Sequence, residues 1–218
     1  MKPKKAIIIV GEPGIGKSTL VKRLMRELKQ SHVGSKFKTE DKAPVEGYRF
    51  ELQGNPTVWI YGRYEDEKAP FFGTDRLSMG VQPFAVGLSN FVRMNNDDAV
   101  VIVEGDRLGN GKFVEALHKI GFQVILVVLT ASPEVVKQRR ADRCAAYGLK
   151  PQADVFIRSR RTKIENVIKN SVGMGQVKTL VVDTLEDLES AYNYVSGFTA
   201  PSFKVSDGVS KALSSANP

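Results

Sequence analysis

The sequence predicts an α/β fold, a single domain in which a parallel sheet is covered by helices on both faces. Short apolar runs recur along the chain, and each is followed by a segment of helical length. Strands that alternate with helices in this way form βαβ units, whose strands run parallel. The 218 residues, 42% of them hydrophobic and 26% charged, are enough to bury one proper core.

The expected strands differ in how deeply they should be buried. Lys5–Val10 is a nearly continuous apolar run, as in strands covered on both faces, and Ala99–Val103 and Gln123–Thr130 have the same character. Thr57–Tyr64 is rich in β-branched and aromatic residues, and Val177–Val182 forms the last strand.

The expected helices lie between and after these strands. The first places Leu20, Leu24 and Leu28 on one stripe, and the fourth begins at Ser132-Pro133, with proline at its first helical position. Glycine and proline interrupt the second. The six ranges are Lys17–Gln30, Arg76–Met94, Phe113–Ile120, Pro133–Ala146, Val155–Lys169 and Leu185–Val195.

Two segments lack a clear period. Residues 31–56 carry glycine, proline and charge, and we expect a loop or a small irregular insertion there. Residues 198–218 are rich in Ser, Ala, Lys and Gly, and we expect a loose tail after a folded domain of residues 1–197.

Composition also bears on compartment. The single cysteine, Cys144, excludes an internal disulfide and a cysteine-cluster metal site, and predicts a reducing compartment, the cytoplasm. No apolar run approaches the roughly 18 residues that span a bilayer, so no membrane association is expected. Oligomeric state stays open.

Positive charge is concentrated in one stretch. The whole chain carries +8, and nine basic residues stand against two acidic ones between Lys137 and Lys163, a net charge of +7. Such a patch predicts a polyanionic partner, DNA being the one we favour. The alternative is a solvated helix face.

A phosphate-binding loop follows the first expected strand. Gly11–Ser18 matches G-x-x-x-x-G-K-[S/T] in full and lies between a buried strand and an amphipathic helix. Glycines let the backbone amides surround phosphate oxygens, the lysine reaches the β- and γ-phosphates, and the serine hydroxyl binds Mg²⁺. The sequence thus predicts ATP with Mg²⁺, bound by Gly11, Glu12, Pro13, Gly14, Ile15, Gly16, Lys17, Ser18 and Thr19.

Carboxylates end the strand at Ala99–Val103. Glu104 and Asp106 flank Gly105, at the carboxyl end of a strand, where ligands bind in open α/β sheets. Either carboxylate is a candidate to hold Mg²⁺ together with Ser18. A plain polar turn is the alternative.

The segment between the second expected strand and helix is dense in useful side chains. Asp75 is a candidate general base toward an acceptor hydroxyl, and Arg63 and Arg76 are candidates to hold an acceptor phosphate. An aromatic side chain is a candidate to stack on a base: Tyr64, Tyr61, Phe71 or Phe72. The structural alternatives are that Asp75 or Thr74 caps the next helix, that the arginines are solvated and that the aromatic residues belong to the core.

Arginines within residues 137–163 suggest a mobile lid. In phosphoryl transfer, lid arginines neutralise charge on the moving phosphoryl group, and Arg143 is our candidate for this role. With Lys17 and Asp75 it completes the expected catalytic set.

These motifs together resemble the P-loop kinase superfamily, in its nucleoside and nucleotide kinase branch, over about residues 4–197. The strand ending in Glu104-Gly105 is similar to uridine-kinase-like enzymes, and Thr130–Arg143 resembles the start of a kinase lid, expected at about residues 137–163. The resemblance implies the P-loop NTPase fold with a basic helical lid.

The segment from Tyr61 to Ser78 resembles small kinases encoded by bacteriophages. Among them are kinases that phosphorylate 5-hydroxymethyluracil within phage DNA, which would act in the host cytoplasm during DNA hypermodification. Asp75-Arg76-Leu77 matches the Asp-Arg-Tyr/His motif of thymidylate kinases only in part, which weakens that assignment.

The resulting hypothesis is an ATP-dependent kinase acting on a hydroxyl of a nucleotide-like acceptor, with 5-hydroxymethyluracil in DNA as the best choice. A deoxynucleoside monophosphate kinase is the first alternative. A P-loop ATPase without a phosphoryl acceptor is an alternative of another class.

Overall fold

Seven strands form one sheet in the order β2-β3-β4-β5-β1-β6-β7 in the computed structural model, which describes residues 4–51, 53–66 and 68–199. The five strands from β4 to β7 in this order pair in parallel, as expected from the alternation of strands and helices. The strands are β1 (Lys5–Val10), β2 (Val33–Lys38), β3 (Glu46–Glu51), β4 (Thr57–Tyr61), β5 (Ala99–Glu104), β6 (Gln123–Thr130) and β7 (Gly175–Val181).

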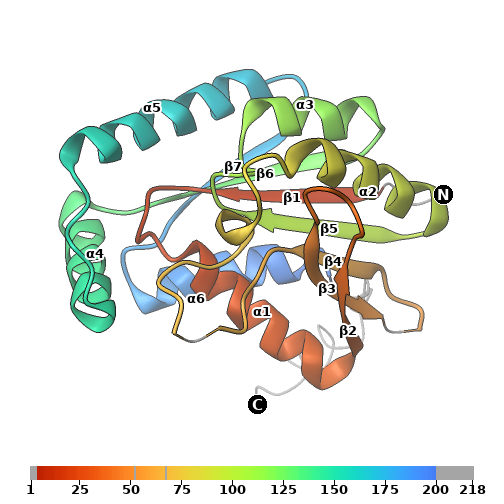
Figure 1. The fold of residues 1–218 in the computed structure, drawn as a ribbon, viewed down its shortest axis with the longest axis horizontal. Helices are drawn as coiled ribbons and strands as arrows, with labels where there is room; N and C mark the ends of the chain where they lie inside the picture. The colour runs from red at the N-terminus through yellow and green to blue at the C-terminus, as the bar shows by residue number, and fades with distance from the viewer. Residues whose placement is uncertain (1–3, 52, 67, 200–218) are drawn as a thin grey trace, which may run out of the picture.

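Helices cover both faces of this sheet, so the predicted α/β architecture is confirmed (Figure 1). One face carries α1 and α6, and the other carries α2, α3 and α5, while α4 lies at the end of the sheet where β1 and β6 finish. The helices are α1 (Lys17–Ser31), α2 (Gln82–Asn95), α3 (Gly111–Lys119), α4 (Pro133–Tyr147), α5 (Asp154–Ser171) and α6 (Leu185–Ser196).

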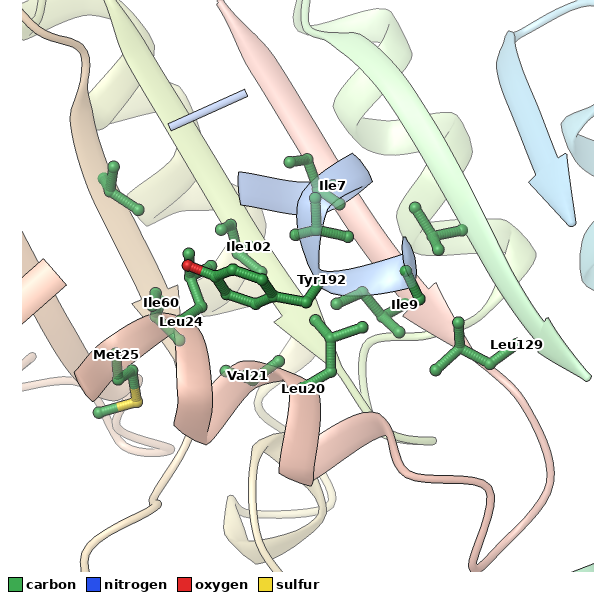
Figure 2. Close-up of a cluster of buried hydrophobic side chains, with 14 of the residues drawn as sticks. Ile7, Ile9, Leu20, Val21, Leu24, Met25, Ile60, Ile102, Leu129 and Tyr192 are labelled. Atoms are coloured by element: carbon green, nitrogen blue, oxygen red, sulfur yellow. The ribbon is translucent and has the colours of Figure 1, made fainter. Parts of the chain in front are cut away.

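Strand alternation divides the core into two layers. Ile7 and Ile9 of β1 point toward α1 and α6, whereas Ala6 and Ile8 belong to the layer beneath α2 and α3. Figure 2 shows the first layer, in which Leu20 and the other apolar residues of the α1 stripe pack on β1. This packing fixes the start of α1, and therefore the loop that precedes it, against the centre of the sheet.

The segment expected to be irregular instead contains two strands. β2 and β3 extend the otherwise parallel sheet in antiparallel pairing beyond β4, so the irregular insertion expected over residues 31–56 was wrong. Tyr48 and Phe50 are buried on either side of half-exposed Arg49, a period-two signal that marks β3. β2 is almost wholly exposed, so its apolar pattern gives no such signal.

Other boundaries also differ from the sequence prediction. The helix expected from Arg76 begins at Gln82, because Pro83 suits a first helical turn, and Thr74–Arg76 forms a short 3₁₀ turn instead. The expected loose tail is wrong at its first residues: Phe198 packs on the core and Thr199 is buried. Its remainder, 200–218, lies outside the described residues. In the described part, no helix is long and apolar enough to cross a membrane.

Two glycine substitutions test the antiparallel extension. A Cβ at Gly47 in β3 would lie 2.1 Å from the Ile60 carbonyl oxygen, so Gly47→Ala should destabilise the fold by about 1–3 kcal/mol. A Cβ added at Gly87 in α2 would meet no atom within 4 Å, so Gly87→Ala should stabilise the fold by about 0.5–1 kcal/mol. Urea unfolding of both variants measures the difference. Equal midpoints for the two variants would contradict the close β3–β4 pairing.

Candidate active site

The turn between β1 and α1 closes around its own lysine. Gly14 and Gly16 have positive φ angles of 88° and 108°, which only glycine adopts readily. The Nζ of Lys17 donates to the carbonyl oxygens of Gly11 at 2.8 Å and Glu12 at 3.0 Å. The loop therefore holds an ammonium group at the carboxyl end of β1, beside the first turn of a helix.

Glu104 stands next to this loop at the end of β5. The Ser18 hydroxyl donates to its Oε1 at 2.8 Å, and the residue is only 1% exposed. Burial raises the pKa of Glu104 to about 7, against the opposing effects of Lys17 and of the Ser18 hydrogen bond. A buried carboxylate thus lies beside the serine that follows the phosphate-loop lysine.

Asp75 and Thr74 fasten the turn that follows Glu104. Asp75 Oδ1 accepts from the backbone N–H of Asp106 at 2.6 Å and of Arg107 at 3.2 Å. The Thr74 hydroxyl donates to the Glu104 carbonyl at 2.7 Å. Burial raises the pKa of Asp75, and nearby Asp106 raises it further. One oxygen of Asp75 is therefore engaged by backbone, and the side chain lines the pocket described below.

Asp106 follows Glu104 by two residues but has different partners, which lie on helix α5. Asp106 forms an ion pair with Arg160 of α5 at 2.9 Å, and the Lys163 ammonium donates to its carbonyl oxygen at 2.6 Å. Arg161 of the same helix binds Glu12 in the phosphate loop at 2.6 Å. Helix α5 is thus tied to both sides of the site by charge.

These elements surround one pocket of about 460 Å³. The phosphate loop forms its floor, and Arg139 and Arg143 of α4 reach it from the end of the sheet. The guanidinium of Arg143 lies 5.4 Å from the Phe71 ring centre, and burial lowers its pKa. Aromatic and apolar side chains complete the wall: Pro70, Phe71, Phe72, Tyr147, Phe156, Leu185 and Leu188.

Most of the residues predicted from the sequence meet in this pocket. They are Gly11, Pro13, Gly14, Gly16, Lys17, Ser18, Thr19, Asp75, Glu104, Asp106 and Arg143. Ile15 is buried in the core, and Glu12 faces α5 through its ion pair with Arg161. The phosphate loop, the carboxylates and Arg143 of α4 therefore come together from distant parts of the chain.

The three residues predicted to bind the acceptor do not line it. Arg63 makes two hydrogen bonds to Glu46, at 2.8 and 2.7 Å, and Arg76 pairs with Asp66 at 3.0 Å. Tyr64 is 4% exposed. The structure thus places the arginines in local ion pairs and Tyr64 in the core, which matches the structural alternatives for these positions.

Sequence reasoning missed other pocket residues. Tyr147, Gln152 and Phe156 reach the pocket from the α4–α5 region, and nothing in their spacing marks them. Thr74 was seen only as a helix cap. Its hydroxyl donates a hydrogen bond to the Glu104 carbonyl oxygen. This bond depends on contact between the 3₁₀ turn and the end of β5, which the order of residues in the sequence does not reveal.

A family model described as P-loop Nucleotide Kinase3 matches residues 2–196. The chain belongs to this P-loop nucleotide kinase family. The family accounts for the fold and for the position of Gly11–Ser18 at the carboxyl end of β1. It confirms the kinase and nucleotide-binding class and leaves the acceptor open.

Comparisons outside this family are distant. No curated protein matches the chain at a significant level. A solved structure from the PezAT chromosomal toxin–antitoxin system of Streptococcus pneumoniae aligns with 15% identity and a TM-score of 0.41. The alignment covers 83% of this kinase and 69% of that chain.

The buried Glu104 predicts a pH-dependent stability in the absence of magnesium and nucleotide. Its pKa rises from an ordinary 4.5 to about 7 on folding, so the folded kinase binds this proton more tightly than the unfolded chain. The associated stability is present below pH 4.5 and is lost as pH rises through 7. The glutamine of Glu104→Gln does not titrate. The free energy of unfolding of this variant, minus that of the wild type, should therefore increase from pH 5 to pH 8 by on the order of 3 kcal/mol.

Urea unfolding of both proteins at pH 5, 6.5 and 8, with a chelator present, measures this difference. Parallel stability curves across the range would show that Glu104 does not titrate as its burial predicts.

Proposed function

We propose that this kinase transfers the γ-phosphoryl group of ATP, with Mg²⁺, to an alcohol hydroxyl of a nucleotide-like acceptor. One observation carries the proposal. A single pocket joins Lys17 of the phosphate loop, the carboxylates Asp75 and Glu104, and Arg143 of α4. These are the charges that positioning and neutralising a transferring phosphoryl group require.

Unpaired donors around the pocket support an anionic ligand. The Nε of Arg143 and of Arg160, and one terminal nitrogen of Arg140, are buried without a hydrogen-bond partner. Buried guanidinium donors left unpaired are costly, and a phosphate oxygen in the pocket would satisfy that of Arg143, which lines it. Arg140 also lies against the phosphate loop, because its Cγ is 2.8 Å from where a Gly14 Cβ would stand.

The oxygen atoms at the end of β5 and the start of α1 fit a magnesium ion. Ser18 and Glu104 would hold it, and buried Tyr64 has a hydroxyl that faces Glu104 without meeting hydrogen-bond geometry. No cluster of three or more His, Cys, Asp or Glu side chains suited to a metal occurs among the described residues. Mg²⁺ typically takes one or two carboxylates and completes its shell with phosphates and water, so Ser18 and Glu104 are a suitable protein contribution. When bound, it would neutralise charge on the phosphates.

The remaining chemistry falls to this chain's own side chains. Asp75 takes the proton of the acceptor hydroxyl through its free oxygen, and the acceptor oxygen bonds to the γ-phosphorus as the bond to ADP breaks. Lys17 and Arg143 neutralise the phosphoryl oxygens. Ionised Asp75 is the active form of the base, and its raised pKa strengthens it.

Our choice of acceptor is the hydroxymethyl group of 5-hydroxymethyluracil in DNA. Phe71, Tyr147 and Phe156 line the pocket and offer aromatic faces to a base swung out of a strand. A monophosphate kinase needs a clamp for the acceptor phosphate, and the paired Arg63 and Arg76 do not offer one. The basic stretch gives only partial support, because Arg160 and Arg161 are engaged within the protein.

An acceptor panel tests this proposal. The purified kinase is incubated with γ-labelled ATP and, in separate reactions, nucleosides, deoxynucleoside monophosphates, ordinary DNA and DNA carrying 5-hydroxymethyluracil. Label in the hydroxymethyl DNA alone supports the proposal. Label in monophosphates and not in DNA would replace it with the monophosphate kinase, and release of phosphate to water alone would replace it with an ATPase.

A further inference from the structure

A second hollow lies between α3 and α5, outside the pocket that holds the phosphate loop. It has a volume of about 510 Å³, and Figure 1 shows the two helices that form it side by side on one face of the sheet. Its described lining offers hydroxyl, amide and ammonium groups and no carboxylate: Asn110, Ser159, Thr162, Lys163, Asn166 and Asn170. We call it the α3–α5 groove.

The polar residues of the groove form a stripe along α5. Ser159, Thr162, Asn166 and Asn170 recur at intervals of three or four residues, so they share one face of the helix. Buried Val167 also lines the groove, next to these polar residues. Uncharged donors arranged in this way suit hydrogen bonds to phosphate and sugar oxygens.

Lys163 connects the lining of the groove to the lining of the candidate active site. This lysine lines the groove, and its ammonium donates to the Asp106 carbonyl oxygen at 2.6 Å. Asp106 in turn lines the phosphate-loop pocket. The groove and the pocket therefore lie on either side of the contact between Lys163 and Asp106.

The charges around the groove favour a polyanion. Lys112 on α3 and Arg158 and Lys169 on α5 are exposed, against the exposed Glu165 on the same helix. Lys163, at the end near the pocket, is already paired with Asp106 and is not counted. The excess is positive, although several other arginines of this region are paired internally.

From the polar lining, the nearness of the pocket and the charge, we infer that the α3–α5 groove binds the sugar–phosphate backbone of a single nucleic-acid strand next to the base being phosphorylated. This inference rests on the proposed polymeric acceptor. The groove positions the strand through its backbone, and the pocket receives the base.

A charge placed in the groove tests the inference. Asn166→Glu adds a carboxylate to the groove, and Asn193→Glu adds the same group to exposed α6 on the opposite face of the sheet. Binding of a fluorescent single-stranded oligonucleotide is measured by anisotropy over a range of salt concentrations. Asn166→Glu should weaken binding by about fivefold or more at low salt, and Asn193→Glu by less than about twofold.

Activity provides the second readout. With oligonucleotides carrying 5-hydroxymethyluracil, Asn166→Glu should raise KM and leave kcat within about twofold, while ATP binding is unchanged. Equal oligonucleotide affinities for the two variants would overturn the groove assignment even where transfer to DNA occurs. If the wild type binds oligonucleotides through the groove but transfers nothing to them, the proposed acceptor fails and the groove assignment stands.

Discussion

Replacing Lys17 with alanine is expected to lower the rate of phosphoryl transfer by about 10²–10³-fold or more. The Lys17 ammonium lies between two carbonyl oxygens of the phosphate loop, at 2.8 and 3.0 Å, so its charge is fixed in place. A fixed charge costs no reorganisation as negative charge develops on the transferring group. Single-turnover transfer from γ-labelled ATP measures the loss.

Lys29→Ala is the matched control for this substitution. Lys29 lies in the last turn of the same helix, and its ammonium pairs with Glu65 on the surface, 3.1 Å away. Its removal should change transfer by less than about twofold. A Lys17→Ala protein that is folded and transfers at a rate close to that of Lys29→Ala would remove the phosphate loop from the chemistry.

Asp75→Asn is expected to lower kcat by about 10²–10⁴-fold while nucleotide binding changes little. Asparagine keeps a carbonyl oxygen that accepts the N–H groups of Asp106 and Arg107, so the turn after β5 is retained. What it loses is the capacity to take a proton. The contrast between kcat and ATP affinity therefore separates a base from a purely structural anchor.

Asp66→Asn provides the comparison for Asp75→Asn. Asp66 is half exposed, pairs with Arg76 and does not line the pocket, so transfer should stay within about twofold. If Asp75→Asn also keeps full kcat, Asp75 serves only to hold the turn. In that case the acceptor proton leaves by another route.

The central elements of this fold were predictable because their signals are local. β1, β6 and α1 each carry a period or an apolar run that burial alone dictates, and the glycines of the phosphate loop stand between a strand and a helix. The antiparallel edge was missed because β2 is exposed along nearly its whole length. Its place in the sheet comes from pairing with β3, which depends on tertiary contact.

The residues of the candidate site also divide into those with a local sequence signal and those whose surroundings depend on tertiary contact. Lys17, Ser18 and Glu104 follow from motifs attached to buried strands, and the structure brings all three together. The roles proposed for Arg63 and Arg76 depended on which carboxylates would lie nearby. Glu46 reaches Arg63 only because β3 pairs next to β4, and a linear sequence does not disclose such a neighbour.

The most direct test of this account is a calorimetric titration of the purified kinase with a non-hydrolysable ATP analogue, with and without Mg²⁺. We expect one site per chain, tighter binding with Mg²⁺, and loss of that magnesium effect in Glu104→Gln, because Ser18 and Glu104 would hold the ion. A folded wild-type protein that binds no nucleotide under either condition would contradict it.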